Sequence, residues 1–247
     1  MDDVTWRVTY QASCPELRLG AHRFDTRHRA VIMGVVQPAA DTSLEIVLET
    51  AAGLVAAGAD AIELVLGGAG RDGADDRLLR AVEGLRARVD VPVAVDADEV
   101  DLLGATLDAG VALVVAGPGP AAALLTDVAA AGASVLLGAR RREVGGAAGR
   151  TGGRTAMLRQ QASEAAEAGI PQQHVVLDLD LRELCDEPEL VASGAPLVLS
   201  TSDTAVQALG IALGSRVIRT HEVRPARRTA AVMAALLAAR ADAAEVR

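Results

Sequence analysis

Polar and charged side chains recur directly after short apolar runs of this 247-residue chain. They are Gln37, Asp41, Glu63, Asp96, Arg140, Asp178, Asp180, the run from Ser200 to Asp203, Arg219 and His221. Carboxylate, hydroxyl, imidazole and guanidinium groups hold polar ligands and move protons. Loops also begin where apolar runs end, so each residue alone is equally well explained as the polar start of a loop. Their recurrence as a set predicts one ligand site.

The tripeptide Arg219-Thr220-His221 provides the most specific pair of candidate ligand-binding residues. Residues two apart on a strand share one side, so we expect Arg219 and His221 to lie within reach of one bound anion. Hydroxyls such as that of Ser202 should lie beside them at a helix start, where an anion is favoured. Asp203 would serve equally well as the N-cap of that helix, so an anion site and a capped helix are alternatives.

Eight apolar runs, separated by Ala-rich segments of helical period, must position these residues. They span 30–36, 61–66, 91–95, 112–115, 134–137, 174–177, 196–199 and 216–219. Strands that are apolar on both faces and alternate with helices are typical of a parallel sheet covered on both sides. Eight such units predict an α/β fold, a closed (β/α)8 TIM barrel, with an open doubly wound sheet as the alternative. Barrels of this kind bind ligands at the carboxyl ends of their strands, where the candidate residues fall.

The N-terminal region predicts a β-hairpin, because Leu17 to Phe24 alternates in hydropathy and turns at Gly20. We expect this hairpin to close the bottom of the barrel. No linker divides the rest, which predicts a single domain over 1–247, with hairpin and lead-in in 1–29 and the barrel in 30–240. The segment Arg140 to Arg154 is rich in arginine and glycine, which predicts a mobile loop after the fifth barrel strand.

Composition excludes several classes of function. All 24 basic residues are arginine, so a lysine Schiff base, a lysine general base and a P-loop lysine are excluded. A formal net charge of −9 argues against a nucleic-acid partner and favours a small molecule. The longest uncharged apolar run, Ala109 to Thr126, is broken by Gly117-Pro118-Gly119-Pro120, so we expect no membrane span.

The positions of the cysteines and histidines indicate whether the chain could bind a metal ion and in which compartment it works. The four histidines are His22, His28, His174 and His221. They lack metal-ligand spacing, and Cys14 and Cys185 stand far apart, so no protein metal cage is expected and His174 is expected to be a structural donor. Two separated cysteines and an N-terminus without an apolar signal core favour the cytoplasm. The small-residue helix from Ala226 to Ala239 predicts a homodimer.

The sequence Gly68-Ala69-Gly70-Arg71-Asp72-Gly73 matches G-x-G-x-x-G between an apolar run and a helix. With Asp96 ending the next run, its spacing fits an NAD(P) site. A complete strand–helix unit precedes it, however, and glycine-rich chains match this pattern by chance. An NAD(P)-binding oxidoreductase is therefore a lesser alternative.

Over nearly its whole length the chain resembles the dihydropteroate synthases and the wider pterin-binding barrel family. Val31–Gln37 is similar to the family's Met-Gly-Ile-Leu-Asn strand, and Asp41 falls at the Asp of its Thr-Pro-Asp-Ser-Phe loop. Gly58–Glu63 is similar to the family's Gly-Ala-Asp-Ile-Ile-Asp segment, and Pro92–Asp96 to its Ile-Ser-Val-Asp-Thr strand. Ala168–Asp178 is similar to the segment that runs from Ala-Gly-Ile through Leu-Asp-Pro-Gly. The most specific piece is Arg219-Thr220-His221-Glu222-Val223, which is close to the terminal Arg-Val-His-Asp-Val.

This resemblance implies a site for a dihydropterin diphosphate, which the family joins to the amino group of p-aminobenzoate with release of pyrophosphate and assistance from magnesium. It implies that Asp96 and Asp178 contact the pterin and that Arg219 and His221 bind the diphosphate. Gln37 and Ser202 fall at further substrate-binding positions. Mg²⁺ would then be bound through the diphosphate.

The chain also departs from the family pattern. Gln37 replaces the first-strand Asn, Val114-Val115-Ala116-Gly117 replaces the fourth-strand Asn-Asp, Ser202-Asp203-Thr204 replaces Ser-Arg-Lys, and the second loop lacks Thr-Arg-Pro. Removing one such donor typically costs ~10²–10³ in rate. We therefore expect a degenerate member with weak or lost synthase activity. A noncatalytic homologue that binds a pterin, an anion or a partner chain is the alternative, and a pterin-dependent methyltransferase module is a lesser one.

Overall fold

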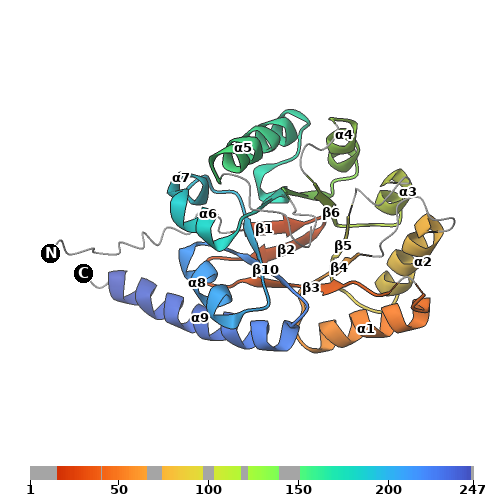
Figure 1. Ribbon diagram of the computed structural model, residues 1–247, viewed down its shortest axis with the longest axis horizontal. Helices are drawn as coiled ribbons and strands as arrows, with labels where there is room; N and C mark the ends of the chain where they lie inside the picture. Colours follow the sequence, from red (N-terminus) through yellow and green to blue (C-terminus); the bar gives the residue numbers. More distant parts are fainter. Residues whose placement is uncertain are drawn as a thin grey trace.

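The computed structural model describes residues 16–39, 41–65, 74–96, 103–117, 122–138 and 151–245. Within them, parallel strands close into a barrel of order β10-β3-β4-β5-β6-β7-β8-β9 (Figure 1). The strands are β3 (Val31–Val36), β4 (Ala61–Leu64), β5 (Val93–Asp96), β6 (Leu113–Ala116), β7 (Ser134–Leu137), β8 (Val175–Asp178), β9 (Leu197–Ser200) and β10 (Val217–Thr220). All eight predicted strands are confirmed, and closure excludes the open doubly wound sheet.

Helices alternate with these strands and surround them (Figure 1). They are α1 (Leu44–Ala56), α2 (Ala74–Arg86), α3 (Leu103–Asp108), α4 (Ala122–Ala130), α5 (Thr151–Glu167), α6 (Leu181–Asp186), α7 (Pro188–Val191), α8 (Thr204–Leu213) and α9 (Val223–Glu245), with a 3₁₀ turn η2 (Gln172–His174) before β8. This alternation confirms the predicted (β/α)8 architecture. Within the described residues, no helix is both long enough and apolar enough to cross a bilayer.

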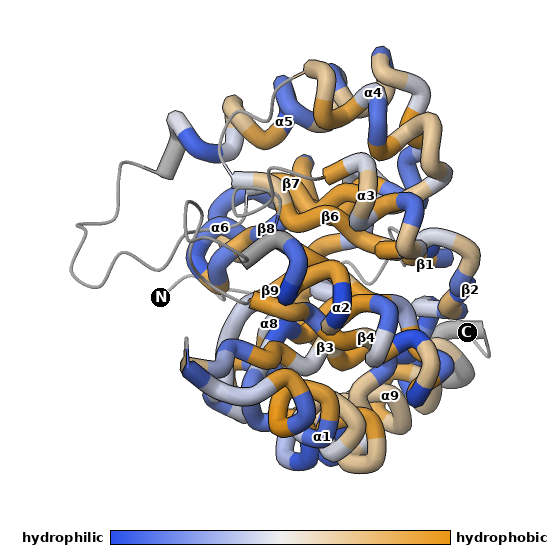
Figure 2. The backbone as a smooth tube through the Cα atoms, turned by 90° about the vertical axis from the view of Figure 1, so that its right-hand side faces the viewer, coloured by the Kyte–Doolittle hydropathy of each residue, from blue (hydrophilic) through white to orange (hydrophobic). Residues whose placement is uncertain are grey.

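The barrel strands are buried on both faces, which explains their continuous apolar runs. Figure 2 shows that most of their length is hydrophobic. One set of alternate residues packs inside the barrel with the hairpin: Leu17, Leu19, Val31, Met33, Ala61, Ala94, Leu113, Val115, Leu136, Val176, Val198 and Val217. The other set packs against the helices in a larger cluster. Because sides alternate along each strand, the inner residues continue in steps of two toward the carboxyl ends.

The predicted N-terminal hairpin is confirmed as antiparallel strands β1 (Glu16–Leu19) and β2 (His22–Asp25). Leu17 and Leu19 are fully buried among the inner side chains of the barrel. At the turn, Gly20 has φ +55°, and a Cβ there would press on Ala112, so glycine fits both needs. The hairpin therefore closes the amino end of the barrel and leaves the carboxyl end for ligands.

Ser134, at the start of β7, joins the hairpin to the barrel. Its Oγ accepts from Gly20 N (3.1 Å), donates to Arg18 O (2.8 Å) and lies 3.0 Å from Nδ1 of His174. Because the hydroxyl proton is used by Arg18, Nδ1 of His174 must donate to Ser134. His174 is thus a structural donor, as predicted.

Lowering the pH should cost the wild-type protein more stability than it costs His174→Asn. Burial, helped by the charge of Arg18 and opposed by Glu16, lowers the pKa of His174 below its ordinary value. The unfolded chain therefore takes up this proton first, and stability falls as the pH drops from about 6.5 toward the folded pKa. Thermal unfolding of both proteins from pH 8 to pH 5 measures this difference, and a gap independent of pH would contradict it.

Asp60, in the turn before β4, ties the start of the barrel to α9. Its carboxylate accepts from Ile32 N (2.8 Å) and pairs with Arg29 and Arg227. Arg227 also donates to Gly58 O at 2.6 and 2.9 Å. The Asp of the Gly-Ala-Asp motif is therefore a structural residue at the amino end of its strand.

Replacing Asp60 by Ala should lower the free energy of unfolding by about 2–3 kcal/mol, because two guanidinium groups and a backbone N–H lose a nearly buried acceptor. Asp90→Ala, at an exposed position before β5, is the matched control and should change stability by less than about 0.5 kcal/mol. Urea unfolding compares the two variants. Equal losses in the free energy of unfolding would show that the contacts of Asp60 contribute no more to stability than the exposed Asp90 does.

The predicted mobile loop Arg140 to Arg154 needs a correction at its end. Residues 140–150 lie outside the described residues, but 151–154 form the first turn of α5. The Arg154 side chain is only 16% exposed. Its guanidinium donates to Gly138 O, Asp178 O and the Glu183 carboxylate.

Candidate ligand site at the carboxyl end of the barrel

Alternation along the strands brings five polar side chains to the inner face of the barrel at its carboxyl end. They are Glu63, Asp96, Asp178, Ser200 and Arg219, each two residues beyond an inner apolar residue. All five were predicted from their positions at the ends of apolar runs. The barrel thus gathers residues from strands that are far apart in the sequence.

Arg219 of β10 forms a two-pronged ion pair with Glu63 of β4. Its Nε lies 2.5 Å from Oε2, and its Nη2 lies 2.5 Å from Oε1. Glu63 is fully buried and the Arg219 side chain is 25% exposed. Burial lowers the pKa of Arg219, but the hydrogen bonds and charge of Glu63 and the charges of Asp178 and Asp96 outweigh burial and raise it. Three carboxylates therefore act on one guanidinium that stays charged.

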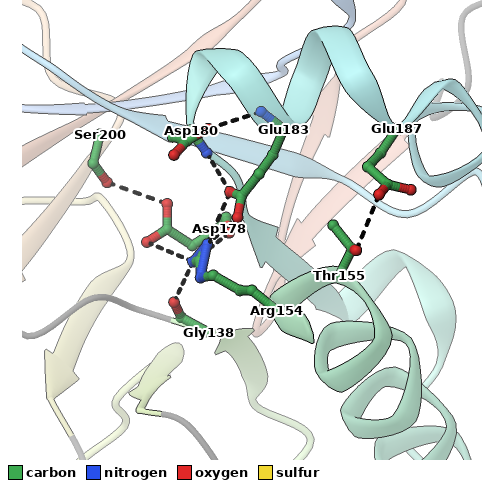
Figure 3. A network of polar contacts seen from close by, with 8 residues as sticks. All are labelled: Gly138, Arg154, Thr155, Asp178, Asp180, Glu183, Glu187 and Ser200. Atoms are coloured by element: carbon green, nitrogen blue, oxygen red, sulfur yellow. Dashed lines mark hydrogen bonds and ion pairs between the residues drawn. The ribbon is translucent and has the colours of Figure 1, made fainter. Parts of the chain in front are cut away.

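Asp178, at the end of β8, is held by its neighbours (Figure 3). Ser200 Oγ lies 3.5 Å from Oδ1, and Nη2 of Arg154 donates to the Asp178 carbonyl at 2.8 Å and lies 3.9 Å from Oδ2. Asp178 is 7% exposed. The side chain of this candidate ligand contact is thus oriented from two sides.

Arg154 organises the wall behind Asp178 (Figure 3). Its Nη1 donates to both carboxylate oxygens of Glu183, at 2.9 and 3.2 Å, and its Nη2 donates to Gly138 O at 2.6 Å. Glu183 is itself held by a capping box, since its carboxylate accepts from Asp180 N and the Asp180 carboxylate accepts from Glu183 N, both at 2.8 Å. Arg154 therefore joins β7, α5, β8 and α6 beside the site.

The remaining candidates lie at the rim. His221 is exposed, and its Nδ1 donates to Val35 O at 3.1 Å. Ser202 Oγ is 3.3 Å from Thr220 Oγ1, and Gln37 is exposed directly after β3. The shared anion between Arg219 and His221 stays a prediction, and Arg219 is already paired.

For Asp203 the structure decides between the two readings left open by the sequence. Its carboxylate accepts from Ala205 N (2.8 Å) and Val206 N (3.1 Å), so it is the N-cap of α8. Asp180 has the same role for α6. Both polar strand-end positions are therefore explained by local helix capping.

Sequence reasoning missed Arg154 and Glu183 as supports of the site. Asp180, followed three residues later by Glu183, was a visible capping-box signal, although a capping box usually begins with Ser or Thr. Nothing local marked Arg154, which stands at the end of a Gly-Arg segment. Residues Gly68 to Gly73, the dinucleotide-like motif, lie outside the described residues. Among the described residues, no group of three or more His, Cys, Asp or Glu could hold a metal ion.

Comparison with known proteins agrees with this geometry. Residues 37–247 match the family profile described as "Pterin binding enzyme". No curated protein matches the chain. Three solved dihydropteroate synthases have the same fold. That of Yersinia pestis with a pterine-sulfa conjugate is 20% identical over 90% of this chain and 98% of its own, with a TM-score of 0.74. That of Xanthomonas albilineans with 4-aminobenzoic acid is 18% identical over 90% and 98% (TM-score 0.76), and that of Clostridium difficile in the presence of pteroic acid is 22% identical over 86% and 98% (TM-score 0.73). At these identities the solved structures establish the fold, and the family match, which spans most of the sequence, establishes that this chain belongs to the pterin-binding enzyme family.

Proposed function

We propose that this protein binds a pterin-type heterocycle at the carboxyl end of its barrel and that its dihydropteroate synthase activity is weak or lost. One observation carries the proposal: in a member of the pterin-binding family, Glu63 pairs with Arg219 at the carboxyl end of the barrel, and the charges of Asp96 and Asp178 act on the same guanidinium. A pterin presents an amino group and ring N–H groups along one edge. Carboxylates accept from such donors in strong charge-assisted hydrogen bonds.

Asp178 and Asp96 are the proposed pterin contacts. Asp178 suits this role because Ser200 and Arg154 hold it at the barrel end. Asp96 suits it because it ends β5 on the inner face and adds its charge at Arg219. The ligands named for the solved relatives, a pterine-sulfa conjugate and pteroic acid, are of the same chemical class.

The synthase reaction also needs neutralisation of a leaving diphosphate, and here the described residues support the proposal of weak activity. The chain has no lysine, and Ser202-Asp203-Thr204 stands where the resemblance expects Ser-Arg-Lys. Losing one positioned donor typically costs ~10²–10³ in rate, and several are lost together. Magnesium enters this proposal only as a companion of a ligand diphosphate, because the described carboxylates form no metal cage.

Two measurements test the proposed function. Isothermal titration with 6-hydroxymethylpterin should give saturable binding that Asp178→Asn and Asp96→Asn weaken about 10–100-fold, since each loses a charge-assisted acceptor. Asp90→Asn, distant from the site at an exposed position, should bind as the wild type does. No saturable binding would refute pterin binding. A pyrophosphate-release assay with dihydropterin diphosphate and p-aminobenzoate should give little turnover; rates of about 1–10³ per second, abolished by Asp96→Asn, would refute the loss of activity.

A noncatalytic homologue is the second candidate, and the absence of lysine together with the other missing donors favours it over a working enzyme. The methyltransferase and oxidoreductase alternatives have no supporting contact among the described residues.

We also propose that the protein works in the reducing cytoplasm, since its cysteines are few and Cys185 is a free thiol. Its net negative charge disfavours binding to nucleic acid, so we propose no nucleic-acid partner.

A homodimer is the proposed assembly. On α9, Val232 and Leu236 are 61% and 54% exposed one turn apart, and Leu209 of the neighbouring α8 is 47% exposed. We expect Val232→Glu with Leu236→Glu to convert the dimer to a monomer, because two carboxylates cannot be buried in an apolar interface. Light scattering after size exclusion measures the mass. Thr126→Glu, on the exposed side of α4 across the barrel from α9 (Figure 1), is the control and should leave the mass unchanged.

A further inference from the structure

We infer that this site selects a pterin-type ligand that carries no phosphate group, because, within the part of the chain that the structure describes, carboxylates of the protein engage both the Arg219 guanidinium and the helix start at which the barrel end could hold a diphosphate. The inference rests on the proposed function and deepens it by naming the ligand class. It is carried by the charges and contacts of Glu63, Arg219, Asp203 and His221.

The first observation is the state of Arg219. Its Nε and Nη2 are engaged by the two oxygens of Glu63, which is fully buried and cannot turn away toward solvent. The charges of Asp178 and Asp96 also fall on this guanidinium. A phosphate brought to Arg219 would therefore lie among three carboxylates, and like charges at short range repel strongly where water is partly excluded.

The second observation is the start of α8. In barrels, backbone N–H groups at a helix start after the seventh strand commonly hold phosphate. Here β9 is the seventh barrel strand, and the Asp203 carboxylate already accepts from the N–H groups of Ala205 and Val206. The anion at this helix start is part of the protein.

The third observation concerns His221. Its Nδ1 donates to Val35 O, so this ring N–H is already used and does not serve a phosphate oxygen. Asp96, Asp178 and the Ser200 hydroxyl end their strands on the described inner face, and acceptors of this kind match a flat heterocycle with amino and ring N–H groups and a neutral substituent.

The test compares 6-hydroxymethylpterin with 6-hydroxymethylpterin diphosphate by isothermal titration of the full chain, with and without Mg²⁺. We expect the alcohol to bind at least 10-fold more tightly than the diphosphate in both conditions, and inorganic pyrophosphate not to compete with it. If the diphosphate binds equally well or better, the inference is overturned while pterin binding stands. If neither pterin binds, the proposed function fails instead.

Two variants locate the cause. Asp203→Asn keeps a good N-cap and removes its charge, so it should tighten diphosphate binding at least 3-fold and leave the alcohol unchanged. Glu63→Gln should release Arg219 and tighten diphosphate binding at least 10-fold. Asp90→Asn makes the same change in net charge before β5, at the opposite end of that strand from Asp96, and should alter neither affinity. If Asp203→Asn folds normally and still gains no affinity for the diphosphate, the role assigned to its charge is wrong.

Discussion

Replacing Arg219 by Met will lower the free energy of unfolding by about 3–5 kcal/mol. The variant leaves the Glu63 carboxylate fully buried without the guanidinium that accepts its charge, and an uncompensated buried charge costs about this much. Asp96 and Asp178 add to the cost, because both lose the positive charge on which their own charges act. Urea unfolding followed by circular dichroism measures the loss.

A paired variant separates charge from packing. Glu63→Met combined with Arg219→Met removes both charges at similar volume, so it should recover about 2 kcal/mol or more of the loss. Arg27→Met removes a solvent-exposed arginine that pairs with exposed Asp25 and should change stability by less than about 1 kcal/mol. If the double variant is as unstable as Arg219→Met alone, the loss comes from packing and not from the stranded carboxylate.

Arg154→Met is expected to have the second largest effect, a loss of about 3 kcal/mol together with weaker binding of pterin. Glu183 is 1% exposed and loses its ion pair with Arg154, and the Gly138 and Asp178 carbonyls lose a donor (Figure 3). Because Arg154 also orients Asp178, the dissociation constant for 6-hydroxymethylpterin should rise about 10-fold, measured by isothermal titration well below the unfolding transition.

The same helix supplies the control. Arg159 is 47% exposed and pairs with Glu187 and Glu189 at 3.4 and 3.5 Å, so Arg159→Met should cost less than about 1 kcal/mol and leave binding unchanged. Glu183→Gln combined with Arg154→Met should regain stability but not affinity, since it removes the stranded charge without restoring a support for Asp178. Recovery of affinity in that double variant would assign Arg154 a purely structural role.

The architecture of this protein was determined by its sequence. Each strand is a short apolar run because both of its faces are buried, and each run is followed by a helix of matching period, so the eightfold alternation was readable without tertiary information. The hairpin was readable for the same reason, since Leu17 and Leu19 alternate and Gly20 marks the turn. The positions of Asp96, Asp178 and Arg219 at strand ends also indicated that their side chains lie at the carboxyl end of the barrel on the inner face, because side chains two apart share a face.

Only the tertiary structure decided which of those charges meet. Glu63 and Arg219 are 156 positions apart, and alternation places each on the inner face without selecting its partner. From the sequence alone, Arg154 was assigned to a loop, because its acceptors come together only when α5 and α6 pack against the barrel. These acceptors are Gly138, Asp178 and Glu183. The physical reason is that periodicity along one element sets the direction of a side chain, whereas the charge it pairs with depends on how distant elements pack. The ion pair between Glu63 and Arg219 was therefore decided by barrel closure.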